Sequence, residues 1–381
     1  MEYSTIFLPV AEHLQKSNAA KSAEQWGNRL KYGVKGFDWE WLSDFQLALV
    51  GLRKPGQPNS FVALREELYA LYAHEKPLQA IDLGDIEVGV AGDAGASDAA
   101  AYALQKLLSL NVLPVVFCEN MLCASLAYKA LKAHQEGVAA TLILPSVSLG
   151  SAQEPPSDDN FMAHIMADYG RGLEALSVVG YQSYLSSPAD VQALAKQHCE
   201  CIRLGHLRDH LLCAEPTLRD ADLLCASVNA VRQSDAPAAT APSPNGLYAE
   251  EMCHLLRFAS FSDMLKSCYV GGFNLTGDSS LQTTKLVAQL IWHVADGVAH
   301  RVGDHPLVDK ACRRLQVEMG GRGQQLTFYH SKASDRWWML VPEGKERPPR
   351  VVACLKEDYE RTLHMEIPDR WLLFQKKWAN R

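Results

Sequence analysis

The sequence lacks two features that would point to nucleic acids or membranes: an excess of basic residues and a long uncharged apolar stretch. Its 37 Lys and Arg residues are outnumbered by 44 Asp and Glu residues. A protein that binds nucleic acid or an anionic membrane needs a basic face, and a membrane-spanning helix needs about 20 mainly apolar residues. We therefore expect no nucleic-acid partner and no membrane insertion. Residues 1–10 also lack the basic start and apolar run of a signal peptide, so we expect a cytoplasmic protein.

Paired cysteine motifs and glycine-rich phosphate loops are missing as well. The chain has 10 cysteines, but the close pair Cys199 and Cys201 is not followed by a second pair at zinc-site spacing. Reduced cysteines of this kind pack as small hydrophobic side chains. Neither Gly-x-x-x-x-Gly-Lys nor Gly-x-Gly-x-x-Gly after a strand occurs, which argues against nucleotide chemistry.

What the sequence does contain is an alternation of short apolar segments with amphipathic ones. Apolar strands between amphipathic helices are typical of parallel sheets covered on both faces. This predicts an α/β protein with three layers, α/β/α, and a mostly parallel sheet. The predicted helices cover residues 61–72, 98–110, 122–134 and 247–258. The predicted strands cover residues 46–52, 78–84, 112–117, 139–144, 177–180, 223–228 and 267–271.

The pattern changes near residue 320. Residues 325–330 and 337–341 resemble an antiparallel strand pair, 351–355 is a candidate third strand, and a helix ends the chain. We therefore expect an α/β domain over residues 1–319 and a small β-rich C-terminal extension over residues 320–381 that packs on it.

A long connection, residues 231–246, lies between the strand ending at Val228 and the next helix. It contains three prolines and the turn pair Asn245-Gly246. Such connections usually have about 2–6 residues. Ligands of open α/β sheets bind where strands end, so this loop predicts a binding site. The plain alternative is an ordinary strand-to-helix connection.

Two motifs resemble the arginase or ureohydrolase family, which includes arginase, agmatinase and formimidoylglutamase, and the chain looks closest to a divergent branch found in Bacteroidota. Asp82-Leu83-Gly84-Asp85 is similar to the Asp-x-Gly-Asp strand end of the family. The segment from Pro237 through Asn245-Gly246 to Glu251 is similar to its Ala-Pro-Gly-Thr-Gly-Thr-Pro-x-x-Gly-Gly-x-x-x-x-Glu signature. The resemblance spans residues 45–300 and implies an eight-stranded sheet and hydrolysis of a guanidinium or amidine C–N bond by water activated by two manganese ions.

The six metal ligands of the family do not carry over to this chain. The resemblance places a ligand histidine at Met121, an Asp-x-His-x-Asp trio at residues 144–148 and an Asp-x-Asp pair at residues 227–229. None of these positions holds a carboxylate or an imidazole, which manganese needs to offset its lost hydration. We therefore expect no manganese, no other cofactor and no catalytic residues. The six positions are Met121, Leu144, Ser146, Ser148, Ser227 and Asn229.

The same residues are candidates for lining a vestigial or repurposed substrate pocket, together with Asn245, Gly246, Glu251 and His164. By resemblance Glu251 would face a guanidinium or amidinium group; its plain alternative is a first-turn glutamate stabilised by the helix dipole.

Three hypotheses about the function follow. The chain is a non-catalytic protein that binds a protein partner or forms homo-oligomers through an aromatic C-terminal surface. It is a sensor of a guanidino or amidine compound. Or it is an active hydrolase whose ligands lie elsewhere.

Overall fold

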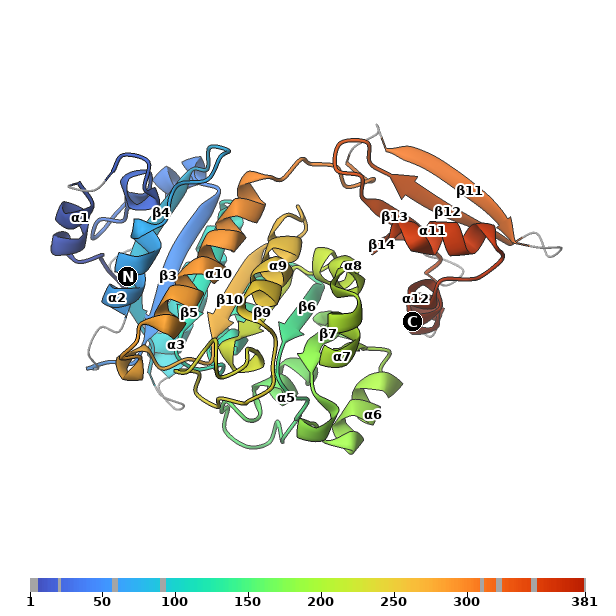
Figure 1. Cartoon of the computed structure of the whole chain (residues 1–381), viewed down its shortest axis with the longest axis horizontal. Helices are drawn as coiled ribbons and strands as arrows, with labels where there is room; N and C mark the ends of the chain where they lie inside the picture. Colours follow the sequence, from blue (N-terminus) through green and yellow to red (C-terminus); the bar gives the residue numbers. More distant parts are fainter. Residues whose placement is uncertain are drawn as a thin grey trace.

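The computed structural model describes residues 6–19, 22–56, 61–89, 94–308, 312–319, 324–343 and 348–379. These residues form a large mostly parallel sheet with helices on both faces and a smaller antiparallel sheet at the C-terminus (Figure 1).

The main sheet has ten strands in the order β1-β4-β3-β5-β10-β9-β6-β7-β8, with β2 also paired to β4. All neighbours are parallel except β1 and β4. The expected number of eight strands is therefore too low, because β1 and β2 are two-residue strands that leave no periodic signal in a sequence. The strands are β1 (Phe7–Leu8), β2 (Lys31–Tyr32), β3 (Leu47–Arg53), β4 (Ala80–Glu87), β5 (Leu113–Cys118), β6 (Val138–Ile143), β7 (Leu173–Tyr181), β8 (Glu200–Arg203), β9 (Leu223–Ser227) and β10 (Ser267–Gly271).

Helices cover both faces of this sheet, so the three-layer prediction is confirmed. Successive side chains of a strand point to opposite faces: Leu47 and Leu49 join one buried cluster, whereas Ala48 and Val50 join the other. The helices are α1 (Glu12–Ala19), α2 (Phe61–Ala70), α3 (Ala94–Ser109), α4 (Ala124–His134), α5 (Phe161–Met166), α6 (Pro188–Lys196), α7 (Leu204–Asp209), α8 (Glu215–Arg219), α9 (Ala249–Ser260) and α10 (Gln282–Ala299).

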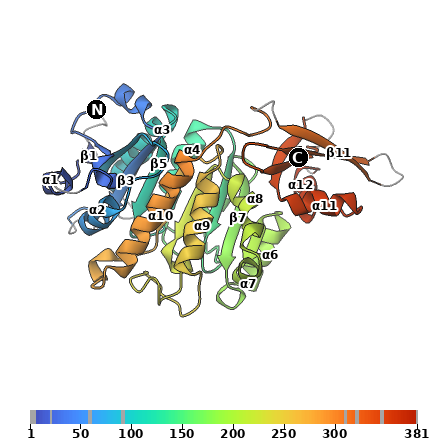
Figure 2. The same ribbon diagram turned by 45° about the horizontal axis from the view of Figure 1, so that its top comes forward.

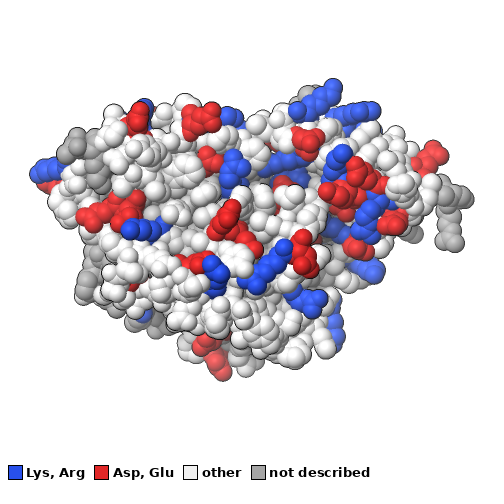
Figure 3. All heavy atoms as spheres, viewed as in Figure 1, with Lys and Arg blue, Asp and Glu red and all other residues white. Residues whose placement is uncertain are grey.

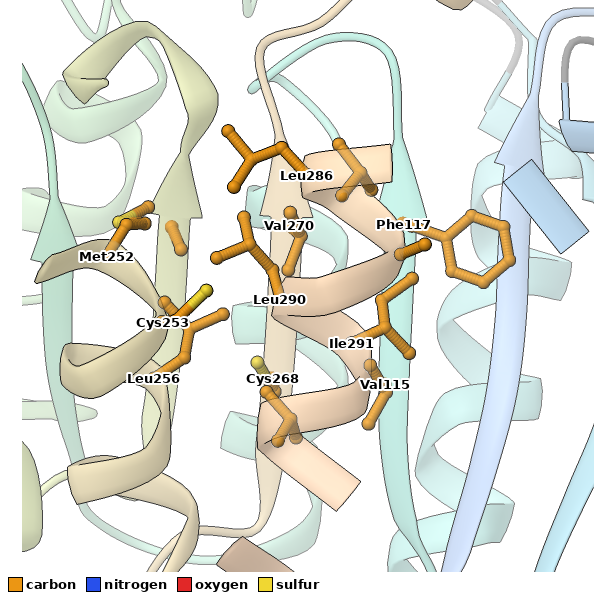
Figure 4. Close-up of a cluster of buried hydrophobic side chains, with 14 of the residues drawn as sticks. Val115, Phe117, Met252, Cys253, Leu256, Cys268, Val270, Leu286, Leu290 and Ile291 are labelled. Atoms are coloured by element: carbon orange, nitrogen blue, oxygen red, sulfur yellow. The ribbon is translucent and has the colours of Figure 1, made fainter. Parts of the chain in front are cut away.

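The centre of the first cluster is formed by α9 and α10 packed on β5 and β10 (Figure 4). Leu290 and Ile291 of α10 are fully buried there, against Val270 of β10 and Val115 of β5. Burying such a side chain contributes about 1.5–3 kcal/mol. This packing fixes the first turns of α9 and α10 at the edge of the sheet where the parallel strands end.

The Asp-x-Gly-Asp motif lies on β4 and is a buried ion-pair network. The Arg65 guanidinium of α2 donates to Asp82 at 2.9 Å and to Asp85 at 2.8 Å, and the Tyr69 hydroxyl donates to Asp82 at 2.7 Å. Burial alone would lower the pKa of Arg65, but the two carboxylates raise it above its usual value. The motif therefore ties α2 to the sheet.

The C-terminal lobe consists of an antiparallel sheet in the order β11-β12-β13-β14 and two helices. The sheet begins at Arg313, N-terminal to the boundary expected at residue 320, because β11 pairs with β12 along its whole length. The elements are β11 (Arg313–Met319), β12 (Gln324–His330), β13 (Trp337–Val341), β14 (Arg350–Cys354), α11 (Lys356–Leu363) and α12 (Asp369–Ala379).

Three arginines attach the lobe to the main domain, and the lobe lies beside α8 (Figure 2). Arg370 of α12 contacts Glu200 of β8 at 3.0 Å and Asp220 at 2.7 Å. Arg219 of α8 donates to the carbonyls of β13 and β14, and Arg350 of β14 pairs with Glu174 of β7.

The tryptophans of the lobe are buried rather than exposed, so the expected aromatic contact surface is wrong. These residues fill the core of the lobe or the junction: Trp337, Trp338, Trp371 and Trp378.

Candidate functional site

Residues 231–246 lie across the ends of β9 and β10 and are held there by backbone hydrogen bonds. Isolated bridges join Val231 to Leu247, Arg232 to Ser243 and Ala239 to Phe273. The N–H of Thr240 also donates to the carbonyl of Gly272, at 3.1 Å. These backbone hydrogen bonds therefore hold the loop against the ends of the strands.

Ser227 and Asn229 lie beneath this loop, and the side chain of Asn229 is bonded to it. The Ser227 hydroxyl accepts the N–H of Asn229, at 3.3 Å. The Asn229 side chain accepts the N–H of Ala241 at 2.8 Å and donates to Thr240 Oγ1 at 3.0 Å. From the other side the backbone of Gly272, with φ of +80°, approaches so closely that a Cβ there would lie 2.6 Å from Ser227 Oγ. The Asn229 side chain therefore holds the loop in place, and the Ser227 hydroxyl is confined between Asn229 and Gly272.

Met121 and Leu144 belong to the apolar core. Met121 is 4% and Leu144 is 5% exposed, in one buried cluster with Val147. The connection before Met121 is fixed to β10, since Glu119 O accepts the N–H groups of Gly272 and Phe273. Ser146 is half-buried and Ser148 is exposed. The structure thus brings Ser227 and Asn229 together under the loop, and Met121 and Leu144 into the core.

The side chains at these positions do not fit a pair of manganese ions. They offer a thioether, an aliphatic group, three hydroxyls and an amide, whereas divalent manganese requires carboxylate and imidazole ligands. Within the described residues, no group of three or more His, Cys, Asp or Glu side chains is arranged to hold a metal ion.

Glu251, Asn245 and Gly246 have separate structural roles. Glu251 Oε2 accepts the backbone N–H of Tyr248 at 2.8 Å, so its carboxylate caps α9. Gly246 is buried, and a Cβ there would lie 2.5 Å from the backbone nitrogen of Arg232. Asn245 is exposed, and its carbonyl accepts from Gln182 Nε2 at 3.2 Å.

His164 of α5 is not joined to this group. Its Nε2 lies 3.1 Å from the carbonyl oxygen of Glu154, and none of the other nine candidates is among its hydrogen-bond partners in the described part of the chain.

Two buried cysteines, Cys118 and Cys123, flank the turn at the end of β5. A hydrogen bond with Cys123 lowers the pKa of the Cys118 thiol, and it raises the pKa of Cys123. The other groups that act on Cys118 are Asn120, Tyr269 and Glu119, with no histidine among them.

A pocket of about 610 Å³ lies at the ends of β7 and β8, and sequence reasoning missed it. Tyr181 is 6% exposed there, and burial raises its pKa. Arg208 donates to the carbonyl of Gly246 at 2.6 Å, and its guanidinium lies over the ring of Tyr248. In the sequence, this pocket is marked by the polar residues Arg203, His206 and Arg208 in one short segment. The lining residues include Tyr181, Gln182, Tyr184, Arg203, His206, Arg208, Asp209 and Asn245.

A second, more open groove of about 800 Å³ lies over the first turns of α9 and α10. It mixes charges of both signs: Arg232 pairs with Asp235 at 2.9 Å, and Lys285 and Glu250 complete the rim. Acidic and basic side chains are likewise interspersed over the face of the molecule in Figure 3. Among the described helices, none is long and apolar enough to cross a membrane.

No protein-family model matches the sequence, and a search of curated proteins finds no match. Solved structures do match. Formiminoglutamase of Trypanosoma cruzi with Mn²⁺ is 15% identical with a TM-score of 0.59, over 68% of this chain and 95% of that chain. Formimidoylglutamase of Bacillus subtilis subsp. subtilis str. 168 is 15% identical with a TM-score of 0.60, over 68% and 92%. The agmatine ureohydrolase of Thermoplasma volcanium is 13% identical with a TM-score of 0.56, over 75% and 98%. The chain therefore has the same arginase-like α/β fold as these structures.

Proposed function

We propose that this chain is an arginase-fold protein without hydrolase activity that works by associating with other proteins or with further copies of itself. One observation carries the first half of the proposal. None of the six positions that the family uses as metal ligands holds a carboxylate or an imidazole: Met121, Leu144, Ser146, Ser148, Ser227 and Asn229.

The charge of the metal ions is the reason that these positions cannot hold them. Two divalent ions bring four positive charges into a site, and neutral oxygen or sulfur atoms do not replace the carboxylates that balance them. Asn229 is also already bonded to Thr240 and Ala241 of the loop, so a metal bound there would have to break these contacts. Without a metal to acidify it, water is not a nucleophile near neutral pH.

The test is a metal and activity measurement on the full chain. After incubation with excess manganese and desalting, we expect less than about 0.1 ion per chain and no hydrolysis of arginine, agmatine or formimidoylglutamate. The Bacillus subtilis formimidoylglutamase, treated identically, is the positive control. Stoichiometric manganese that is retained by the wild type and lost from Asn229→Ala, or hydrolysis of any of the three compounds, would refute the proposal.

The association half rests on the C-terminal lobe. The lobe is fixed to the main domain by buried arginine contacts, and its sheet presents one strand edge away from that domain. We expect the protein to co-purify from its native cell as a complex larger than one chain. Recovery of monomer alone would count against this half. We also infer a cytoplasmic location, because cysteines of the main domain such as Cys118, Cys225 and Cys268 are buried as free thiols, as expected in a reducing compartment.

A second candidate function is ligand sensing in the pocket at the ends of β7 and β8. Arg203 and Arg208 outnumber Asp209 in its lining, which favours the carboxylates of formimidoylglutamate over the cationic agmatine. In calorimetric titrations, Arg203→Gln should weaken formimidoylglutamate binding about tenfold, with Arg171→Gln as a matched exposed control. Tighter binding of agmatine, or binding abolished by Glu251→Ala, would favour the cation-binding role of Glu251 instead.

A further inference from the structure

Strand β11 is the outer edge of the C-terminal sheet. β12 pairs with it without a register shift from Arg313 to Met319, and among the described residues no strand pairs with its other side. In Figure 1 this edge faces away from the main domain. An unbroken edge strand of seven residues without proline offers backbone N–H and C=O groups that another strand can pair with. Proteins usually cover or interrupt such an edge.

The side chains of β11 are sorted between the two faces of the sheet. Leu315, Val317 and Met319 pack into the core of the lobe. Arg314, Gln316 and Glu318 alternate with them and are exposed. Arg314 and Glu318 are about 13 Å apart along the strand, so they cannot pair with each other.

The sequence of this edge is complementary to itself. If two copies run antiparallel with Gln316 opposite Gln316, Arg314 of each copy lies opposite Glu318 of the other. On the core face of the sheet, Leu315 then lies opposite Val317 of the second copy. A shift of the register by two residues in either direction loses both ion pairs. Opposite charges directly across an antiparallel pair are favourable, and like charges are unfavourable.

We propose that the chain self-associates through β11, so that the C-terminal sheets of two copies join into one continuous antiparallel sheet. The inference rests on the proposed function and deepens it, because it names a second copy of this chain as the partner. Backbone hydrogen bonds supply the contact, and the Arg314–Glu318 pairs set the register. The competing arrangement is a monomer in which the charged side chains keep the edge from pairing.

Charge exchange on the full chain tests the register. Sedimentation velocity should show a dimer for the wild type. Arg314→Glu leaves acidic residues at both positions, and Glu318→Arg leaves basic residues at both, so each variant should weaken the dimer at least about tenfold. An equimolar mixture of the two variants should restore the dimer as a heterodimer. The double variant R314E/E318R should restore the homodimer.

Lys332→Glu, an exposed charge reversal in the turn between β12 and β13, is the matched control and should leave the dimer unchanged. Far-ultraviolet circular dichroism checks that every variant folds. A wild type that stays monomeric at all concentrations overturns the inference, as does a dimer that none of the exchanges alters. Neither result changes the metal measurement, and the second leaves association through another surface standing.

Discussion

The carboxylate of Glu251 accepts a hydrogen bond from the backbone N–H of Tyr248, at 2.8 Å, across the first turn of α9. The residue that the family resemblance assigns to a substrate cation is therefore used to satisfy an N–H group at the start of a helix. The neighbouring guanidinium groups of Arg208 and Arg232 lie over the ring of Tyr248. The first turn of α9 is thus held by contacts within the chain, through Glu251 and Tyr248.

Removing this cap should lower stability without affecting any binding. We expect Glu251→Ala to reduce the free energy of unfolding by about 0.5–2 kcal/mol, the usual cost of losing an N-terminal cap. Glu250→Ala is the control, because that carboxylate is exposed and makes only a long contact of 3.9 Å with His254. Urea unfolding measures both. Equal stability of the two variants would show that the cap is not formed in solution.

The close approach of Gly272 to Ser227 yields a second prediction. A Cβ at residue 272 would lie 2.6 Å from Ser227 Oγ, and the residue also has φ of +80°. Gly303 has a φ of +66°, but a Cβ added there would meet nothing within 4 Å, so this position isolates the cost of the backbone conformation. We expect Gly303→Ala to cost about 1–2 kcal/mol of unfolding free energy and Gly272→Ala clearly more. Equal costs would mean that the backbone after β10 does not pack against Ser227 in solution.

The central fold was readable from the sequence because its strands are continuously apolar. Residues such as Leu47–Arg53 and Leu223–Ser227 are buried on both faces, and that pattern is unambiguous. β8 was missed because Glu200–Arg203 is a short edge strand with half-buried and charged residues. β11 was missed although Leu315, Val317 and Met319 alternate with polar residues, which is the usual pattern of a half-buried strand.

The site was less readable than the fold. The neutral residues at the ligand positions were visible in the sequence, but the bonds of Asn229 to Thr240 and Ala241 depend on the folded path of the loop. The pocket beside Arg203 and Arg208 depends on the pairing of β7 with β8, which no local pattern encodes. The plain alternative to a substrate contact was a first-turn glutamate stabilised by the helix dipole, and the hydrogen bond of Glu251 to Tyr248 appears only in the geometry of the turn.

The contact of Arg370 with Glu200 and Asp220 should be essential for attaching the C-terminal lobe. Removing a buried cation leaves its carboxylates uncompensated, which typically costs about 3–5 kcal/mol. We expect Arg370→Met to lower the free energy of unfolding by this amount, or to separate the unfolding of the lobe from that of the main domain. Lys356→Met removes an exposed pair with Glu360 on α11 and should leave the free energy of unfolding nearly unchanged. A single unchanged transition in Arg370→Met would show that other contacts attach the lobe.

His74 should make stability depend on pH in a predictable direction. Its ring lies against Trp26 and Trp292, its Nε2 is 3.1 Å from the carbonyl of Trp292, and burial lowers its pKa below the usual value. The unfolded chain therefore takes up a proton at higher pH than the folded chain does. The stability that His74 contributes is fully present above about pH 6.5 and is lost as the pH falls through the lowered pKa. Burial lowers the pKa of His305 too, so its contribution has the same sign.

The measurement compares the free energy of unfolding at about pH 7.5 and about pH 5.5 in the wild type and in His74→Gln, which keeps a hydrogen-bond donor. The wild type should lose more stability on acidification than the variant. His254→Gln changes an exposed imidazole and should retain the wild-type dependence. If His74→Gln and the wild type lost equal stability, the ring would be protonated as easily in the folded chain as in the unfolded one, and its burial between the two tryptophans would not hold in solution.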